Sequence, residues 1–165
     1  MELSDKLKGL LGDFLQALST LNVEFLVVGG VAVNHHGYSR SSNDIDLWYY
    51  PVITNFEKIL KALEKAGHDT TDLKQLVFDP KKTYLRIPLG YFQIELLPGI
   101  HEGMTPAQSK KEFKACMAKC DTNQVGKTKF PVIGYDDLIR FKKISARPKD
   151  LLDVNELERL RKSTK

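Results

Sequence analysis

The sequence predicts an α+β fold, in which a small β-sheet is flanked by helices and followed by a helical C-terminus. Apolar residues recur with the helical period near both ends of the chain, which indicates amphipathic helices. The short apolar run over residues 23–28 stops at a Gly-Gly pair and is typical of a buried strand. Residues 83–89 and 91–97 are strand-like runs joined at Gly90, which predicts a β-hairpin.

The expected elements follow in order, and most have a local start or stop signal. A polar N-cap opens the first helix, glycines end the first strand and the central helix, and an Arg-Pro pair separates the last two helices. In the first half of the chain we expect a helix from Ser4 to Leu21, a strand over 23–28, helical turns over 31–36, a strand opening at 44–47 and a helix over 54–66. The hairpin follows, and after it we expect a loop over 98–109, a short helix over 110–119 and an extended segment over 123–133. Two helices, over 135–146 and 149–162, end the chain. Residues 1–165 are expected to form a single domain whose core covers 23–97.

The stretch from Gly29 to Asp46 contains a Gly-Gly turn followed by a pair of aspartates. Gly29 and Gly30, at the start of a helix, let a phosphate approach the backbone and leave N–H groups free to bind an anion. Because side chains alternate across a strand, Asp44 and Asp46 project from the same face. Neighbouring carboxylates raise each other's pKa unless a cation neutralises them, and oxygen ligands near phosphates favour Mg²⁺. These residues predict a metal–triphosphate site; the alternative is an ordinary turn and two solvated aspartates.

These motifs resemble those of the nucleotidyltransferase superfamily that includes DNA polymerase β, in particular its small bacterial members. Such proteins carry an apolar strand ending in Gly-Gly or Gly-Ser, a short connection, and Asp-x-Asp between apolar residues. Here thirteen residues separate Gly30 from Asp44. Residues 40–47, RSSNDIDL, are similar to the Arg-x-Thr-x-Asp-Ile-Asp-Leu string of the branch related to AbiEii-type toxins and antibiotic nucleotidyltransferases. The resemblance implies a small mixed β-sheet of the polymerase β-like nucleotidyltransferase fold, two Mg²⁺ ions, and an NTP, for which we expect ATP.

Glu95 is the expected third carboxylate of the site. It interrupts an otherwise apolar strand, where an acid is unfavourable unless it is paired, exposed or bound to metal. The resemblance implies an acid on a strand beside the aspartate pair, which accepts the proton of an attacking hydroxyl or helps to bind metal. Most family members carry aspartate at this position, so the glutamate departs from the family pattern. The alternative is that Glu95 faces solvent from an edge strand.

Two residues of the loop before the aspartates are candidates for phosphate contact. Arg40 lies in the part of this loop that should face the phosphates, and the alternative is a structural pair with a carboxylate. Ser42 supplies a hydroxyl where the family usually has threonine. The adjacent His35 and His36 should point about 100° apart on a helix, so we expect no metal bound by the two together.

Two lysines near the C-terminus are further candidates for the nucleotide site. Residues 142–150 look like the Lys-x-x-x-x-Arg-x-Lys-Asp string of small family members. The resemblance implies that Lys142 or Lys149 reaches the nucleotide phosphates. The alternative is an exposed basic helix end paired with Asp150 and Asp153.

Composition and charge narrow the function only slightly. The formal net charge of +4 suits binding of ATP or a nucleic acid, but a lysine-rich surface gives the same value. Aromatic residues are not interleaved with the basic ones, so a plain nucleic-acid-binding module is the least favoured hypothesis. The apolar runs are shorter than the roughly 18 residues of a membrane span, and Met1–Asp5 lacks the features of a signal peptide. We therefore expect a cytoplasmic protein without a membrane segment.

Two hypotheses from different classes fit these residues. The first is a nucleotidyltransferase that moves a nucleoside monophosphate from an NTP to an acceptor hydroxyl, with the three acids as catalytic and metal-binding residues. The acceptor would be a small molecule such as an antibiotic, RNA or another nucleic acid, or a protein side chain. The second is a non-catalytic nucleotide-binding or toxin–antitoxin-type interaction protein with the same fold. The chain has little room for an acceptor domain, so unless the acceptor is small we expect a homodimer or a cognate partner protein to complete the cleft.

Overall fold

A computed structural model describes residues 5–90 and 92–164, with side chains for 9–90 and 92–164. Ser4, the expected N-cap of the first helix, and Tyr91, the expected first residue of the second hairpin strand, lie outside the described residues. Within the described ranges, no helix combines the length and the apolar character that crossing a membrane requires.

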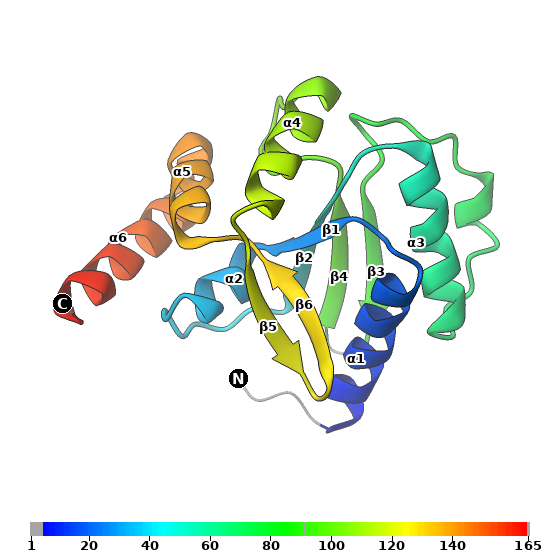
Figure 1. Cartoon of the computed structure of the whole chain (residues 1–165), viewed down its shortest axis with the longest axis horizontal. Helices are drawn as coiled ribbons and strands as arrows, with labels where there is room; N and C mark the ends of the chain where they lie inside the picture. Colours follow the sequence, from blue (N-terminus) through cyan, green and yellow to red (C-terminus); the bar gives the residue numbers. More distant parts are fainter. Residues whose placement is uncertain (1–4, 91, 165) are drawn as a thin grey trace.

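The described residues form six α-helices, one 3₁₀-helix and six β-strands (Figure 1). In chain order these are α1 (Asp5–Thr20), β1 (Phe25–Val28), α2 (Gly29–His35), β2 (Asp44–Tyr49), α3 (Ile53–Lys65), η1 (Leu73–Gln75), β3 (Leu85–Leu89), β4 (Phe92–Leu97), α4 (Pro106–Met117), β5 (Asp121–Val125), β6 (Thr128–Val132), α5 (Tyr135–Ser145) and α6 (Pro148–Ser163).

All six strands belong to one sheet, in the order β3-β4-β2-β1-β6-β5. The β2–β4 and β1–β6 pairs are parallel, whereas β1–β2, β3–β4 and β5–β6 are antiparallel. The predicted α+β class, with a mixed sheet and a helical C-terminus, is therefore confirmed. The predicted β-hairpin corresponds to β3 and β4, in which Leu89 lies opposite Phe92.

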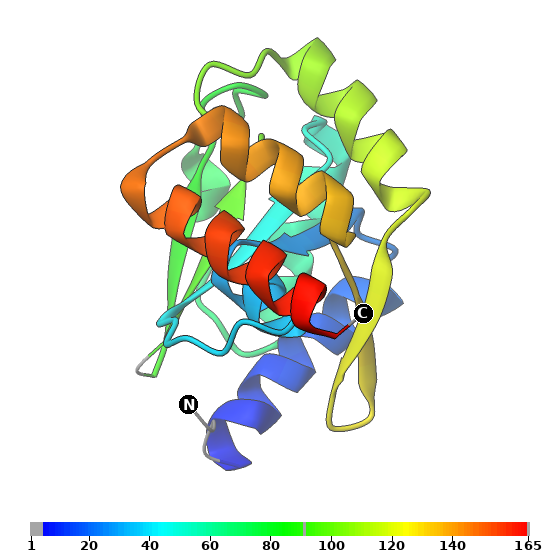
Figure 2. The same cartoon turned by 90° about the vertical axis from the view of Figure 1, so that its left-hand side faces the viewer.

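Helices cover both faces of this sheet. On one face the indole of Trp48 lies between Phe113 of α4 and Phe141 of α5, with edge-to-face ring centroids at 5.4 and 5.9 Å. On the other face Tyr49 contacts Phe56 of α3, and α1 lies beside α3. Figure 2 shows α5 and α6 side by side in front of the sheet, on the opposite side from α1 and α3 in Figure 1.

Trp48 is completely buried, and its polar edge is paired within the protein. Its indole N–H donates to the Ser109 hydroxyl at 3.0 Å, and that hydroxyl donates to the Pro98 carbonyl at 2.5 Å. This chain of hydrogen bonds joins the end of β4 to the first turn of α4, and thereby fixes the loop between them.

Two segments differ from the sequence-based expectation. The segment 98–109 is not a loop throughout, because α4 begins at Pro106 instead of 110. Thr105 caps this helix in a reciprocal capping box with Gln108, and Pro106 occupies the first helical turn, where its missing N–H costs no hydrogen bond. The extended segment expected at 123–133 is a complete hairpin, β5–β6, which turns at Gly126 with φ +58°.

The break expected at Arg147-Pro148 separates α5 from α6. Ala146 ends α5 in the left-handed conformation, with φ 51°, and Pro148 begins α6. The two helices consequently fold back on each other, and the turn between them lines the same cleft as the start of β2 and the C-terminal end of β4.

Candidate active site

The three predicted acids lie on two adjacent parallel strands. In the β2–β4 ladder Asp46 pairs with Glu95, and Asp44 pairs with Gln93. Asp44, Asp46 and Glu95 therefore project from one face of the sheet. The intervening residues Ile45 and Leu47 are buried on the other face. The expectation that Glu95 lies beside the aspartate pair agrees with this register.

Asp46 is the most perturbed acid of the three. Burial is the largest cause, and a hydrogen bond with Glu95 adds to it, so that the pKa of Asp46 rises to about 7. The negative charges of Glu95 and Asp44 act in the same direction. One carboxylate oxygen of Asp46, Oδ1, is buried without a hydrogen-bond partner among the described residues. Asp46 is thus a half-buried acid with a raised pKa, and one of its carboxylate oxygens is buried without a partner among the described residues.

The pKa of Glu95 is shifted in the opposite direction, below its usual value. Burial opposes its ionisation, but hydrogen bonds from Asp46, Tyr84 and Arg86 outweigh burial and lower the pKa of Glu95. The Arg86 guanidinium donates to Glu95 Oε1 at 3.0 Å from the neighbouring strand β3. The side chain of Glu95 is only 15% exposed, so it does not face solvent freely. The two carboxyl groups therefore form a pair in which the pKa of Asp46 is raised and that of Glu95 is lowered.

The two glycines of the Gly-Gly turn have different neighbours. A Cβ at Gly29 would lie 1.9 Å from Asp46 Oδ2, and the backbone of Gly29 has φ +66°. A Cβ at Gly30 would lie 2.7 Å from the Ser42 hydroxyl, which itself donates to the Asp44 carbonyl at 2.8 Å. Gly29 therefore makes room for the Asp46 carboxylate, whereas Gly30 makes room for the loop that precedes β2.

The acids open into a cleft of about 860 Å³. Its walls come from β3, from the loop after β4 and from the turn between α5 and α6. The charged and imidazole side chains that line it are Asp44, Asp46, Lys81, Arg86, Glu95, His101, Glu102, Arg147 and Lys149. Lys149 is close enough to Asp46 for its charge to favour ionisation of that acid. The volume falls within the range of small-molecule binding sites, and cations surround the acids.

Arg40 and Lys142 lie in a buried ion-pair cluster. Arg40 donates to both oxygens of Asp153, at 2.8 and 2.9 Å, and Asp153 is only 1% exposed. The Lys142 ammonium lies 2.9 Å from Asp153 and 3.4 Å from Asp150. This cluster agrees with the structural pair considered for Arg40 and with the pairing of Lys142 with Asp150 and Asp153, but Lys142 is buried and not part of an exposed helix end. A phosphate contact would require each cation to release its carboxylate.

The two cations also differ in position. Lys142 lines a small space of about 90 Å³ beside Gly29 and Asp46. Arg40, in contrast, lines an apolar pocket of about 200 Å³ formed with α1 and the β5–β6 hairpin. Of the candidate basic residues, only Lys149 lines the acidic cleft directly.

Sequence reasoning missed Arg86 and misjudged the two adjacent histidines. Arg86 could have been found, because a two-residue turn that pairs Leu89 with Phe92 necessarily places Arg86 opposite Glu95. His35 and His36 do not point apart as expected, because one ligand atom from each lies within 4.8 Å of the other and of Asp121. The helix ends at His35, so His36 leaves the helical path, and both rings lie near Asp121.

No protein-family description matches this chain, and no curated protein matches it in sequence. Its function must therefore be argued from the arrangement of its own residues.

Proposed function

We propose that this protein is a Mg²⁺-dependent nucleotidyltransferase with a polymerase β-like fold, which transfers a nucleoside monophosphate from ATP or another NTP to an acceptor hydroxyl. One observation carries the proposal. Asp46 pairs with Glu95 across parallel strands, and its buried Oδ1 has no hydrogen-bond partner among the described residues. A buried carboxylate oxygen without a partner is unfavourable unless a ligand completes it.

The donor set fits magnesium. Asp44, Asp46 and Glu95 offer only carboxylate oxygens, the ligand type that Mg²⁺ prefers, and the sheet holds them on one face. When bound, the metal would neutralise the triphosphate and polarise the phosphoryl group that is attacked. The raised pKa of Asp46 fits the same role, because a nearby divalent cation favours the ionised form of a carboxyl group.

The remaining residues of the cleft have roles that follow from their charge and position. Lys149 lines the cleft and attracts a polyphosphate. Arg147 also lines the cleft, but its guanidinium donates to Asp150 at 2.8 Å, so a phosphate would have to compete with that carboxylate. Glu95 is already anionic, and in this role it accepts the proton of the acceptor hydroxyl. Gly29 lets the Asp46 carboxylate lie directly against the start of α2.

One contact favours a second candidate, a protein that binds the nucleotide without transferring it. Arg86 donates to Glu95, and a carboxylate held by a guanidinium is a weaker base. In that case Asp44 and Asp46 hold the metal and the nucleotide, and the protein acts through a partner, as in a toxin–antitoxin pair.

The decisive experiment measures ATP binding by calorimetry with and without Mg²⁺. Wild type should bind ATP only with Mg²⁺, and Asp46→Asn should weaken binding at least tenfold, on the order of 1.4 kcal/mol or more. Asp72→Asn is the matched control, because Asp72 is an exposed aspartate outside the cleft. Equal Mg²⁺-dependent affinities in wild type and Asp46→Asn would refute the site.

The two candidate functions are then separated with ATP labelled at the α-phosphate. Transfer of the labelled nucleoside monophosphate to pooled hydroxyl compounds, RNA and proteins is measured. For an enzyme, Glu95→Gln should lower turnover by roughly 10²-fold or more with little change in ATP affinity. Tight Mg²⁺-ATP binding by wild type without transfer to any acceptor would favour the non-catalytic candidate.

A further inference from the structure

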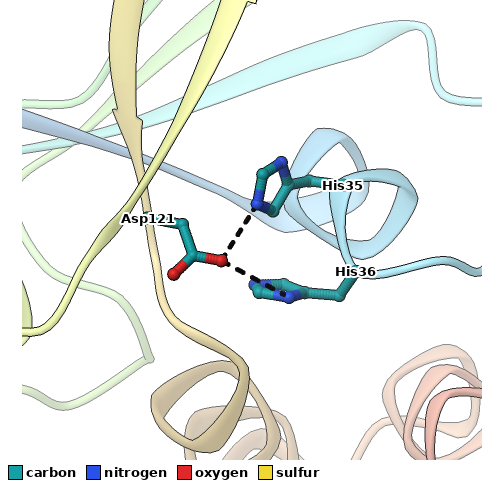
Figure 3. Close-up of side chains that lie close together, drawn as sticks. All are labelled: His35, His36 and Asp121. Carbon is teal, nitrogen blue, oxygen red and sulfur yellow. Dashed lines mark hydrogen bonds and ion pairs between the residues drawn. The ribbon is translucent and has the colours of Figure 1, made fainter. Parts of the chain in front are cut away.

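His35, His36 and Asp121 converge at a place that the acidic cleft does not include (Figure 3). His35 is the last residue of α2, His36 follows it, and Asp121 is the first residue of the edge strand β5. His35 Nε2 lies 3.1 Å from Asp121 Oδ2, and His36 Nδ1 lies 4.0 Å from the same oxygen. One ligand atom from each of the three residues lies within 4.8 Å of the other two.

The local backbone explains why two adjacent histidines meet. His36 has φ −87° and ψ 7°, so the chain leaves the helix at this residue. The rings consequently stand edge to face with centroids 4.8 Å apart, and both turn toward Asp121 (Figure 3). Tyr135 contacts the His36 ring from another side, with a centroid distance of 5.7 Å.

A second observation concerns the hydrogen bond of His36. Its Nε2 lies 2.7 Å from the carbonyl oxygen of Ile133, a group that can only accept, so Nε2 carries the proton. In the neutral ring, Nδ1 then has a free lone pair, and it is Nδ1 that faces Asp121. Histidine ligands of metals are typically fixed in this way, with the other ring nitrogen donating to a carbonyl or carboxylate.

We propose that His35, His36 and Asp121 form a binding site for a transition-metal ion of the Zn²⁺ class, separate from the Mg²⁺ site. Two imidazole nitrogens and one carboxylate oxygen suit Zn²⁺, whereas Mg²⁺ takes oxygen ligands. Three protein ligands leave a fourth position for water or for a group from a ligand. The Asp121 side chain is 48% exposed, so an ion reaches the site from solvent.

The spacing of the three ligand atoms can be compared with that around a bound ion. Tetrahedral Zn²⁺ with bonds of about 2.0–2.1 Å places its ligand atoms about 3.4 Å apart. The two separations from Asp121 Oδ2 bracket that value, at 3.1 and 4.0 Å. Movement of the exposed Asp121 side chain adjusts its own two separations, and the two histidine nitrogens, which lie within 4.8 Å of each other, must also approach to hold one ion.

The bound ion would act as a clamp between α2 and the β5–β6 hairpin. The seven residues of α2 span about 10 Å, with Gly29 at the acidic site and His35 at the proposed metal site. Fixing the end of α2 to the sheet edge should therefore stabilise the fold without adding a ligand to the acidic cleft.

The test uses the full chain, freed of metal by a chelator, and the metal salts alone. Titrated with ZnCl₂, wild type should bind one Zn²⁺ ion at this site and should unfold at a higher temperature than the metal-free protein. Titrated with CoCl₂, it should show the visible absorption bands of tetrahedral Co²⁺. Asp121→Asn and His36→Gln should each weaken Zn²⁺ binding at least tenfold and abolish the Co²⁺ bands. Asp121→Asn changes an exposed side chain, so it should leave the fold intact, as circular dichroism will check.

Two controls separate this site from the others. His68→Gln, which changes a histidine outside the cluster, and Asp44→Asn in the cleft should both keep the Zn²⁺ affinity within about twofold of wild type. If wild type binds no Zn²⁺, or if Asp121→Asn and His36→Gln both bind it as tightly as wild type, the proposal is refuted. Neither result affects the Mg²⁺-ATP experiment, which examines different residues.

Discussion

Two opposing influences set the pKa of Asp46. Burial, Glu95 and Asp44 favour the protonated form, while Lys149 favours the ionised form, and the balance gives a pKa of about 7. In an unfolded chain an aspartate has a pKa of about 3.9. The folded protein therefore binds a proton at Asp46 between pH 4 and 7 that the unfolded chain has already lost, and this difference couples folding to pH.

The sign of that coupling gives the first prediction. Because the folded state binds more protons over this range, the contribution of Asp46 to the free energy of unfolding falls as the pH rises from about 4 to 7. Without divalent ions, Asp46→Asn should thus be more stable than wild type at pH 8, by at most about 4 kcal/mol, with little difference at pH 4. Glu95, whose pKa is lowered, contributes stability that is fully present above its unfolded pKa and is lost only in the acidic range below it, so it does not change between pH 5 and 8. Urea unfolding at both pH values provides the measurement, and a pH-independent difference would contradict it.

Gly29 gives the second prediction. In Gly29→Ala the new Cβ would meet Asp46 Oδ2 at 1.9 Å on a backbone with φ +66°, so the variant should lose about 2 kcal/mol of stability or more. Its Mg²⁺-ATP affinity should also fall, because the Asp46 carboxylate must move. Gly12→Ala is the matched control, since Gly12 lies in α1 and its added Cβ would have only one neighbour, at 4.0 Å. That control should be neutral or more stable, by at most about 1 kcal/mol. A thermal melt that ranks Gly29→Ala with Gly12→Ala would disprove this account of the turn.

At the scale of the elements, the buried cluster around Asp153 attaches the last two helices to the sheet. Asp153 of α6 binds Arg40 from the loop before β2 and Lys142 from α5. Removal of one buried partner leaves the other charges uncompensated, which costs several kcal/mol in proteins. The position of α5 and α6, and with them one wall of the cleft, therefore depends on this carboxylate.

The third prediction tests that attachment. Asp153→Asn should lower the free energy of unfolding by about 3 kcal/mol, because Arg40 and Lys142 both lose their charged partner. The control is Glu158→Gln on the same helix, where the Lys143–Glu158 pair, at 3.2 Å, is exposed and worth no more than about 0.5 kcal/mol. Denaturant midpoints for both variants decide the matter. If Asp153→Asn proves as mild as Glu158→Gln, the cluster does not hold the helices.

Some features of these elements could be predicted from the sequence and others could not. The strand carrying Asp44 and Asp46 and the hairpin carrying Glu95 follow from local pattern, because alternation and turn residues are short-range signals. The start of α4 was also encoded locally, in the capping box at Thr105, but Pro106 was interpreted as part of a loop. The pairing of Asp153 with Lys142 is among the alternatives that the sequence offers, because the two residues are close in the chain. Its pairing with Arg40 was not predictable, because Arg40 lies 113 residues away and only the folded chain brings them together.

At the scale of the whole molecule, the sheet is well covered at its centre and open at one edge. In β2, four of six residues are buried, whereas no residue of β5 is buried and β5 pairs with β6 alone. Local opening is easiest where few side chains are buried and backbone hydrogen bonds face solvent. The β5–β6 hairpin should therefore open more readily than the strands that carry the acids.

Hydrogen exchange gives the fourth prediction. In metal-free protein, the hydrogen-bonded amides of β5 should exchange roughly tenfold or more faster than those of β2, because β2 lies inside the sheet and four of its six residues are buried. Peptide-resolved mass spectrometry is the measurement, and the β2–β4 segments serve as the internal reference. Equal protection of β5 and β2 would indicate that the whole sheet opens as one unit.

The position of Trp48 has a practical consequence for solution work. It is the sole tryptophan of the sequence, it is completely buried, and it lies two residues from Asp46 on the same face of β2. Indole emission from the folded protein should therefore occur at shorter wavelength than from the unfolded chain, and all of it arises beside the acids. Phe141 of α5 lies against this indole, and the C-terminal end of α5 lines the cleft. A ligand that shifts α5 as it binds should consequently change the intrinsic fluorescence, so that occupancy of the cleft can be followed without an attached dye.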